Sequence, residues 1–211
     1  VIDDSLIGIQ NFRARIVGID NMGYITSSEY KTPEIQFSKG ELSMDHAYSQ
    51  YPAGIPTGRY RLMSWPGKPV NTSLAHSKLK DGHVFYSWDT EEEEFIMADF
   101  IELGRSYWFR HEYENPLVFS EDSSIAVPLE NYTIKLEQGW NMVGNPFSFP
   151  VQYAKDSTVN DPITFMEIAN KDGWSEPQTE LKPWNGYAVY AAAESDLILI
   201  PFQEKDSSAQ R

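Results

Sequence analysis

The chain has 211 residues, 41% of them hydrophobic and 14% aromatic, which is enough to bury one substantial core or two small ones. Acidic residues outnumber Lys and Arg by 31 to 17, and the net charge of −14 opposes binding to nucleic-acid phosphates or to anionic membranes. The longest apolar runs, at residues 187–193 and 197–202, are far shorter than the about 20 residues that cross a bilayer, and no cysteine is present for a disulfide or a thiolate site.

Composition favours strands over helices along the whole chain. The aromatic residues (6 Trp, 12 Tyr and 11 Phe) are combined with 13 Gly and 13 Pro, a mixture typical of short strands separated by turns. The best helical candidate is residues 89–100, but its four consecutive Glu fit a solvated turn or loop at least as well. The sequence therefore predicts an all-β fold. Since the chain opens at Val1 without an initiator Met or a signal sequence, we expect a mature product or a fragment.

The N-terminal region, residues 1–40, contains a pattern typical of a strand pair. Phe12, Ala14 and Ile16 alternate with other side chains as in a half-buried strand, and the Asp-Asn-Met-Gly run at 20–23 fits a hairpin turn. Residues 12–28 resemble the last two strands of a fibronectin type III or similar immunoglobulin-like domain. Such a domain needs about 100 residues. We therefore expect these three side chains to face another subunit or the rest of a larger protein.

The remainder of the chain shows an internal repeat in which matching positions differ by 80 in residue number. Residues 58–66 match residues 138–146, so that Tyr60 pairs with Trp140 and Pro66 with Pro146. The same offset pairs Phe85 with Phe165, Ile101 with Leu181, Tyr107 with Tyr187, and residues 117–119 with 197–199. We predict β repeats at 41–127 and 128–202, followed by a tail at 203–211. They would form a pseudo-symmetric sandwich or paired small barrels, with a repeat-defining core of Tyr60, Pro66, Tyr107, Trp140, Pro146 and Tyr187.

Two stretches of the second copy, residues 136–147 and 181–190, resemble a repeat of large secreted bacterial surface proteins. Its hallmark is a Gly-Trp-Asn-aliphatic-aliphatic-Gly/Ser-Asn-Pro-Phe start and a later Gly-Tyr-Trp/Ala-Val-Tyr strand. The first copy departs from it, with Tyr60 for Trp, Trp65 for Asn and Ser106 for Gly. The resemblance implies an extracellular or cell-surface module without known chemistry, and thus a structural or interaction role in adhesion or assembly.

Catalytic and metal motifs are not recognisable in the sequence. The four histidines, His46, His76, His83 and His111, lack the spacing that places two imidazoles on one metal, and neither a Gly-x-Ser-x-Gly elbow nor a phosphate-binding loop occurs. The acidic stretches at 156–161 and 170–173 offer oxygen ligands but not the spacing of an EF-hand. We therefore predict a protein that is not an enzyme and has no cofactor, with calcium kept as a possible bound ion.

Tryptophan near turns supports an alternative function. Sugar rings stack on exposed aromatic faces, and Trp88, Trp174 and Trp184 stand next to predicted turns. The alternative is a carbohydrate-binding module, alone or attached to a secreted enzyme, with extracellular polysaccharide as the partner. Solvent exposure of these three side chains discriminates it from a purely structural role.

Overall fold

The computed structural model describes residues 17–19, 25–27, 41–43, 51, 53–69, 82–117, 123–125, 127–168 and 171–201. Within these ranges every regular secondary-structure element is a β-strand and every strand pair is antiparallel, which confirms the all-β class. In the same ranges no helix has the length and apolar character needed to cross a membrane.

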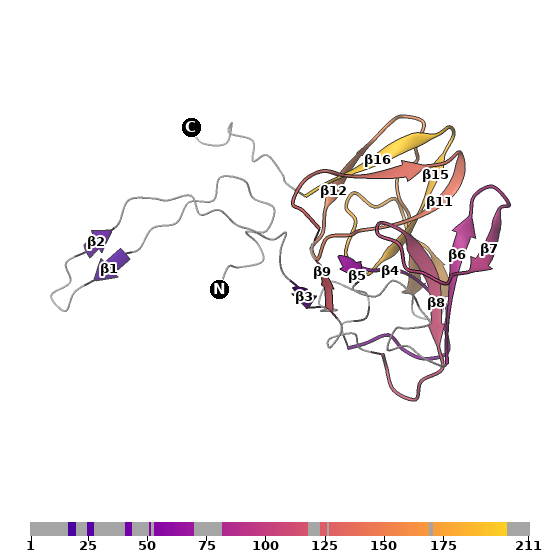
Figure 1. Cartoon of the computed structure of the whole chain (residues 1–211), viewed down its shortest axis with the longest axis horizontal. Coiled ribbons are helices and arrows are strands. Elements are labelled where there is room, and N and C mark those ends of the chain that lie inside the picture. Colours follow the sequence, from indigo (N-terminus) through magenta and orange to yellow (C-terminus); the bar gives the residue numbers. More distant parts are fainter. Residues whose placement is uncertain are drawn as a thin grey trace.

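The first half is built on a four-stranded sheet of order β4-β8-β6-β7 (Figure 1). These strands are β4 (Arg61–Ser64), β6 (His83–Asp89), β7 (Glu94–Met97) and β8 (Ser106–His111). A small sheet of order β3-β9-β5 joins β3 (Glu41–Ser43), β9 (Ser123–Ile125) and β5 (Lys68–Pro69).

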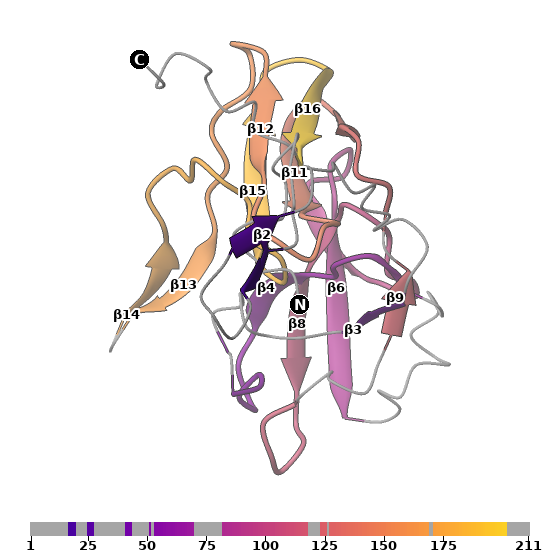
Figure 2. The same cartoon turned by 90° about the vertical axis from the view of Figure 1, so that its left-hand side faces the viewer.

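The second half contains a three-stranded sheet and two pairs of strands. The sheet has the order β10-β16-β12, from β10 (Tyr132–Leu136), β16 (Ser195–Ile200) and β12 (Gln152–Lys155). The strands β11 (Gly139–Gly144) and β15 (Gly186–Ala191) pair with each other. The hairpin of β13 (Phe165–Ile168) and β14 (Lys171–Trp174) projects from the side of the body (Figure 2).

The N-terminal strands β1 (Val17–Ile19) and β2 (Ile25–Ser27) lie at the two ends of the predicted hairpin turn. They pair only with each other among the described strands, and Figure 1 shows them apart from the other sheets. Phe12, Ala14 and Ile16 lie outside the described residues.

Strands β4–β8 and β11–β15 pair in the same register. Adding 80 to both residue numbers converts each residue pair of β4–β8 into a residue pair of β11–β15, so that Leu62 opposite Trp108 becomes Met142 opposite Ala188. Backbone bridges of Met63 with Asn185 and of Arg105 with Val143 join the two strand pairs. The backbone N–H of Ser64 donates to the Trp184 carbonyl (3.1 Å), and that of Gly144 to the Gly104 carbonyl (2.9 Å). Backbone contacts thus join β4 to the chain just ahead of β15, and β11 to the chain just ahead of β8.

Small residues allow the strand pairs β4–β8 and β11–β15 to approach each other closely. Ser64 and Ser106 stand opposite each other in β4–β8, as do Gly144 and Gly186 in β11–β15. A Cβ on Gly144 would lie 2.2 Å from Ser64 Cβ, and one on Gly186 would lie 2.7 Å from Ser106 Cβ. Larger side chains would separate the strand pairs, since interiors are close-packed.

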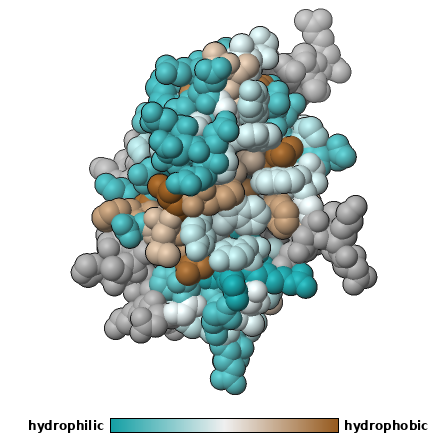
Figure 3. Space-filling model, turned by 90° about the vertical axis from the view of Figure 1, so that its right-hand side faces the viewer, coloured by the Kyte–Doolittle hydropathy of each residue, from teal (hydrophilic) through white to brown (hydrophobic). Residues whose placement is uncertain are grey.

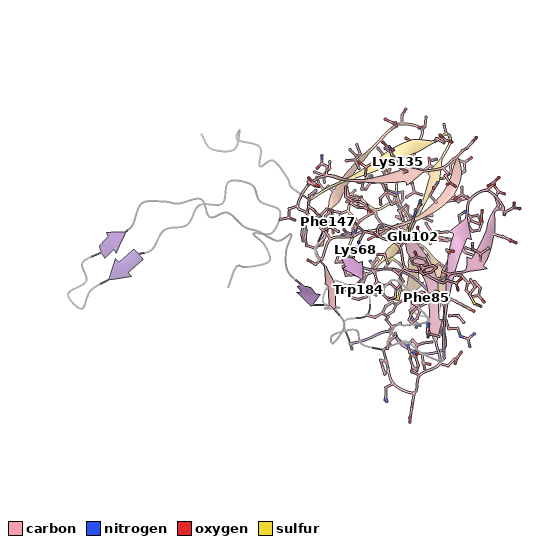
Figure 4. The ribbon with its side chains drawn as sticks, in the orientation of Figure 1. Lys68, Phe85, Glu102, Lys135, Phe147 and Trp184 are labelled. Atoms are coloured by element: carbon pink, nitrogen blue, oxygen red, sulfur yellow. The ribbon has the colours of Figure 1, made fainter. Side chains whose placement is uncertain are left out.

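Each half has its own apolar core. Phe85, Trp65, Tyr107 and Phe109 belong to the first, and Figure 4 shows Phe85 there with Trp184, which reaches it from the second half. The second core is formed by side chains from all parts of that half, including Ile134, Val143, Phe147, Val151, Leu181, Tyr187, Val189, Leu197 and Leu199. Leu62 of β4, Met142 of β11 and Ala188 of β15 form a third, smaller buried cluster.

Two buried tyrosines have the same role at equivalent positions of the two halves. The Tyr107 hydroxyl accepts from the backbone N–H of Glu102 (2.7 Å), and the Tyr187 hydroxyl accepts from that of Lys182 (2.6 Å). Burial raises the pKa of each phenol from 10 to about 12. The hydroxyls therefore stay neutral in the fold and fix the chain ahead of β8 and β15.

Two details differ from the sequence predictions. Residues 89–100 form no helix and are more than a loop: Asp89 Oδ1 accepts from the backbone N–H of Glu91 and Glu92, and the chain returns as β7. Phe85 and Phe165 occupy different places, because β6 pairs with β8 over four residues, whereas in the second half Ile163 contacts Ala188 and the chain then departs as β13.

Candidate binding face

The asparagines of the surface-protein hallmark hold the backbone. Asn145 is fully buried; its amide donates to the carbonyls of Phe149 (2.7 Å) and Leu181 (2.8 Å), and its Oδ1 accepts from the N–H of Phe147 (2.8 Å). Asn141 closes the turn before β11 through Glu137 and the Gly139 carbonyl. All their polar atoms are used in the fold, so neither residue offers a group to a ligand.

Histidine chemistry is also absorbed by the fold. His111 is buried, its Nδ1 accepts from the N–H of Tyr113 (3.2 Å), and its Nε2 therefore carries the proton donated to the Ile55 carbonyl (2.8 Å). His83 Nδ1 lies 3.4 Å from the Tyr113 hydroxyl. His46 and His76 lie outside the described residues.

The acidic loops were considered for calcium. Within the described ranges no three His, Asp or Glu side chains are grouped so that they could hold a metal ion. Asp161 accepts from the Tyr153 hydroxyl (2.9 Å) and pairs with Lys155 (3.3 Å), while Asp156 accepts from Ser195 (3.1 Å). Burial and the Asp161 carboxylate together raise the pKa of Tyr153. These two carboxylates are engaged in loop capping.

One face of the four-stranded sheet carries aromatic side chains that lie outside the first core, although Trp88, Trp108 and Phe165 pack on the small buried cluster of Leu62, Met142 and Ala188. In β8 the buried Tyr107 and Phe109 alternate with the half-buried Trp108 and Arg110. The register aligns Trp108 with Tyr86 across β6, and Trp88 with Phe95 across β7. Because residues opposite one another share a face, these rings form a second aromatic layer on the side away from the first core.

Aromatic rings from both halves meet on this face. Trp108 lies 5.0 Å from Phe165 and 6.2 Å from Trp174, measured between ring centroids, so the β13–β14 hairpin extends the layer. We call the resulting surface the aromatic face; its rings are Tyr60, Tyr86, Trp88, Phe95, Trp108, Phe165 and Trp174. Tyr60 is 42% exposed, and Phe95 and Trp174 are each 45% exposed.

Four of these rings line a hollow. Tyr60, Tyr86, Phe95 and Trp108 line an open hollow of about 350 Å³, and we call this space the aromatic cleft. The rings of Tyr60 and Tyr86 are 6.0 Å apart and tilted by 57°, and those of Phe95 and Trp108 are 6.4 Å apart and tilted by 85°. Both separations are in the range of direct ring contact, and the hollow beside these rings is widely open to solvent.

Charged groups border the aromatic cleft. The four exposed glutamates at 91–94 directly precede Phe95 on the β6–β7 hairpin. The Arg110 guanidinium lies 5.6 Å from the Tyr60 ring centre and pairs with Glu112. Figure 3 views this side of the molecule and shows hydrophilic side chains above a band of apolar and pale ones. Of these glutamates, Glu91 lines the polar hollow described next.

A second, polar hollow of about 470 Å³ lies between the β6–β7 hairpin and β11. Its lining includes Trp88, Arg105 and the acidic residues Asp89, Glu91, Asp99, Glu102 and Glu137. The Thr90 hydroxyl bridges its rim by donating to the Trp140 carbonyl (3.0 Å). No arrangement of base and nucleophile is apparent among these side chains.

The predicted tryptophans separate into two groups. Trp88 and Trp174 both belong to the aromatic face. Trp184 does not: it is only 1% exposed, because a positive φ of 70° directs its ring into the first core against Trp65, at 5.8 Å. The prediction of Trp184 as a ligand-facing side chain is therefore wrong.

The predicted core set also needs correction. Pro66, Tyr107, Pro146 and Tyr187 are buried. Tyr60 and Trp140 are each 42% exposed. Tyr60 directly precedes β4, and Trp140 lies near the start of β11, so both are at the opposite end of these strands from the close contact of Ser64 with Gly144. Trp108 lies in β8 between the buried Tyr107 and Phe109 and is half-buried on the aromatic face. Its alternation with Tyr107 and Phe109 is the signal that could have identified it.

Comparisons of this chain with models of protein families, with curated proteins and with solved structures find no match.

Proposed function

We propose that this chain is a non-catalytic interaction module of a secreted or cell-surface bacterial protein, acting in adhesion or extracellular assembly. The observation that carries the proposal is the aromatic face. Aromatic residues are enriched where proteins bind partners, and contiguous exposed apolar surface on a soluble protein marks interaction sites. The polar groups of the repeat hallmark hold the backbone instead of facing a pocket, which also favours binding over chemistry.

We further propose that the two halves are copies of one β repeat. The identical register of β4–β8 and β11–β15 supports this, as do the matching hydroxyl contacts of Tyr107 and Tyr187. Arg61 donates to the Arg59 carbonyl where, at the equivalent positions of the second half, Asn141 donates to the Gly139 carbonyl. The resemblance to bacterial surface repeats extends to the first half on this basis.

The N-terminal pair supports assembly with further polypeptide. A two-stranded ribbon alone is marginally stable in water, and β1 and β2 pair only with each other in the part of the chain that is described. An unpaired strand edge can accept another strand. We propose that a neighbouring subunit, or the rest of a larger protein, completes this sheet.

Site-specific photo-crosslinking in the producing cell tests the interaction role. A photoreactive phenylalanine analogue at position 95 or 174 should give discrete crosslinked products. The matched control is position 133, where Thr133 is exposed on β10, far along the chain from the aromatic face. Equal crosslinking at 133, or none at 95 and 174, refutes the proposal.

Carbohydrate binding is the second candidate, because Trp88 and Trp174 share one face. Sugar rings stack on indole faces. Native electrophoresis in gels containing soluble polysaccharide tests it: migration should be retarded for the parent chain and restored for Trp174→Ala. The control is Trp140→Ala, whose similarly exposed ring packs on Tyr190.

A further inference from the structure

Strand β7 is the outer edge of the four-stranded sheet, and its side chains are mostly apolar. In the order β4-β8-β6-β7 it pairs only with β6 among the described strands (Figure 1). All four of its side chains are exposed, and Met97 is 64% exposed. The strand contains no Pro or Lys, and its register with β6 runs without a bulge. Natural proteins use these devices to block strand edges, so the edge of β7 is open to a further strand.

The backbone of β7 has polar groups that no described residue uses. The N–H of Ala98, directly after β7, donates to the Phe85 carbonyl (2.9 Å), so it points toward β6. Along a strand of an antiparallel pair, the backbone groups of successive residues point alternately toward the partner and away from it. Those of Phe95 and Met97 therefore point away from β6, where β7 has no neighbour in the described part of the chain. An extended segment can form hydrogen bonds with this row.

A strand added at this edge would continue two different surfaces. Phe95 stands opposite Trp88, and both belong to the aromatic face. Ile96 stands opposite Ser87, and both line the polar hollow. Successive side chains of a strand lie on opposite faces of the sheet. Every second side chain of the added strand would therefore lie beside Phe95, which favours apolar residues, and the others would lie on the side of the hollow.

The polar hollow determines the charge of this second set. Its lining includes five carboxylates and one cationic residue, Arg105. Residues 89–104, which contain β7 and the turn before it, have seven acidic residues and no Lys, Arg or His. No three of the described carboxylates are grouped so that they could hold a metal ion. Cations on flexible side chains suit such a border, since opposite charges attract across an interface and like charges repel.

The same charges oppose pairing of β7 with a second copy of this chain. Two antiparallel β7 strands centred on Ile96 would place Glu93 of one copy opposite Asp99 of the other. Like charges directly opposite each other are destabilising, and each chain has a net charge of −14. The acidic residues around β7 thus keep identical edges apart and favour a basic partner.

We propose that the free edge of β7 binds an extended segment of a partner protein, in which Lys or Arg alternates with apolar residues, as an additional strand of the sheet. The backbone groups of Phe95 and Met97 bond to the backbone of the partner. Its apolar side chains extend the aromatic face, and its cations lie on the side of the polar hollow. This inference rests on the proposed interaction function, because it names the partner of the surface to which Phe95 belongs.

Titration with synthetic peptides tests the chemistry of the partner. The probe is a peptide of alternating Lys and Val. Alternating Glu and Val tests the charge requirement, and the Lys-Val peptide with every amide N-methylated tests the backbone requirement. In calorimetry the unmodified Lys-Val peptide should bind about tenfold or more tightly than either control, and less tightly at high salt. In NMR spectra it should slow hydrogen exchange of the Phe95 and Met97 amides, which side-chain contact alone would not do.

Substitutions at position 97 locate the backbone contact. Met97→Pro removes an N–H that points away from β6, and Pro is tolerated on strand edges in this orientation, so the urea midpoint of the chain should be retained. Binding of the Lys-Val peptide should weaken about tenfold or more, because a hydrogen bond is lost and the ring obstructs the incoming strand. Met97→Val is the matched comparison, since it changes the same side chain but keeps the N–H; it should bind about fivefold or more tightly than Met97→Pro.

Two double variants of equal net charge test the role of the hollow. Glu91→Gln with Asp99→Asn removes two exposed carboxylates that line the hollow. This change should weaken binding of the Lys-Val peptide and reduce its dependence on salt. Glu130→Gln with Glu194→Gln removes two exposed carboxylates that line neither hollow, and should weaken binding less. The difference between the two variants places the cations of the peptide.

Four results would overturn the inference. Equal binding of the N-methylated peptide reduces the effect to charge, and equal binding by Met97→Pro and Met97→Val moves the site away from β7. Equal effects of the two double variants remove the hollow from the site. A dimer of the free chain in sedimentation, dissociated by Met97→Pro, makes a second copy the occupant. Where one of these results occurs and crosslinks still form at positions 95 and 174 in the cell, the interaction function stands while the strand inference fails.

Discussion

Replacing Gly144 by alanine tests the close approach at the centre of the molecule. The added Cβ would lie 2.2 Å from Ser64 Cβ and 2.8 Å from the Arg105 carbonyl oxygen. Carbon atoms in favourable contact are about 3.5–4.0 Å apart. Both neighbours are fixed to backbone, so the strands themselves must separate. That movement strains the bridge of Arg105 with Val143 and the hydrogen bond from Gly144 to Gly104.

The expected loss of stability is at the upper end of the range for overpacking. Extra methyl groups in tight cores cost about 1–3 kcal/mol, and sometimes more, so we expect about 3 kcal/mol for Gly144→Ala. Urea unfolding followed by tryptophan fluorescence measures it. Gly173→Ala is the matched control, because that glycine also lies in a strand and its added Cβ meets no atom within 4 Å; its stability should change by about 0.5 kcal/mol or less.

A second-site change separates the clash from a general effect of alanine. Ser64→Gly removes the nearest clashing atom but also the hydroxyl that donates to the Asn185 carbonyl (2.8 Å). In the double variant, part of the loss should be recovered, giving a coupling free energy of about 1 kcal/mol or more. The reasoning fails if Gly144→Ala is as stable as Gly173→Ala, or if the two substitutions are additive.

Three further predictions concern buried polar groups. Because burial raises the pKa of Tyr107 and Tyr187 from 10 to about 12, stability should be constant below pH 10 and fall as the pH rises through 12, by up to about 3 kcal/mol for each phenol; alkaline unfolding of Tyr187→Phe, shifted to higher pH, checks this. At neutral pH Tyr107→Phe and Tyr187→Phe should each lower the free energy of unfolding, measured with urea, by about 1 kcal/mol, since each loses one hydrogen bond. A difference of more than about 2 kcal/mol between the two losses would argue against equivalent roles. Asn145→Ala leaves two carbonyls and one N–H without their partner, so we expect a loss of about 3 kcal/mol; Gln152→Ala on the exposed face of β12 should be neutral in the same assay.

The sequence predicted the strands well where local chemistry decides them. The alternating aromatic residues of 106–111, the hairpin at 17–27 and the final apolar strand at 195–200 all form strands. The constant offset that aligns Tyr107 with Tyr187 also predicted that both are buried alike. These features depend on residue spacing along one strand, which the sequence contains directly.

The sequence did not predict which face of a strand is covered. Tyr107 and Trp108 are neighbours with similar propensities, and only the layer packed against each face makes one buried and the other half-exposed. Trp184 was expected at the surface because it stands next to a predicted turn, yet its positive φ directs the ring into the core of the other half. Both outcomes are set by contacts between residues far apart in the chain.

The aromatic face arises where the two halves differ. Ala188 occupies in the β11–β15 pair the place that Trp108 occupies in the β4–β8 pair, so that only the first half projects a large aromatic side chain there. In the first half β6 stays beside β8 and brings Tyr86 next to Trp108. In the second half the chain departs after Ile163, and the hairpin that results carries Phe165 and Trp174 to the same Trp108. The contacts between the strand pairs β4–β8 and β11–β15 fix the position of the two halves. The differences between the halves provide a surface that neither half has alone.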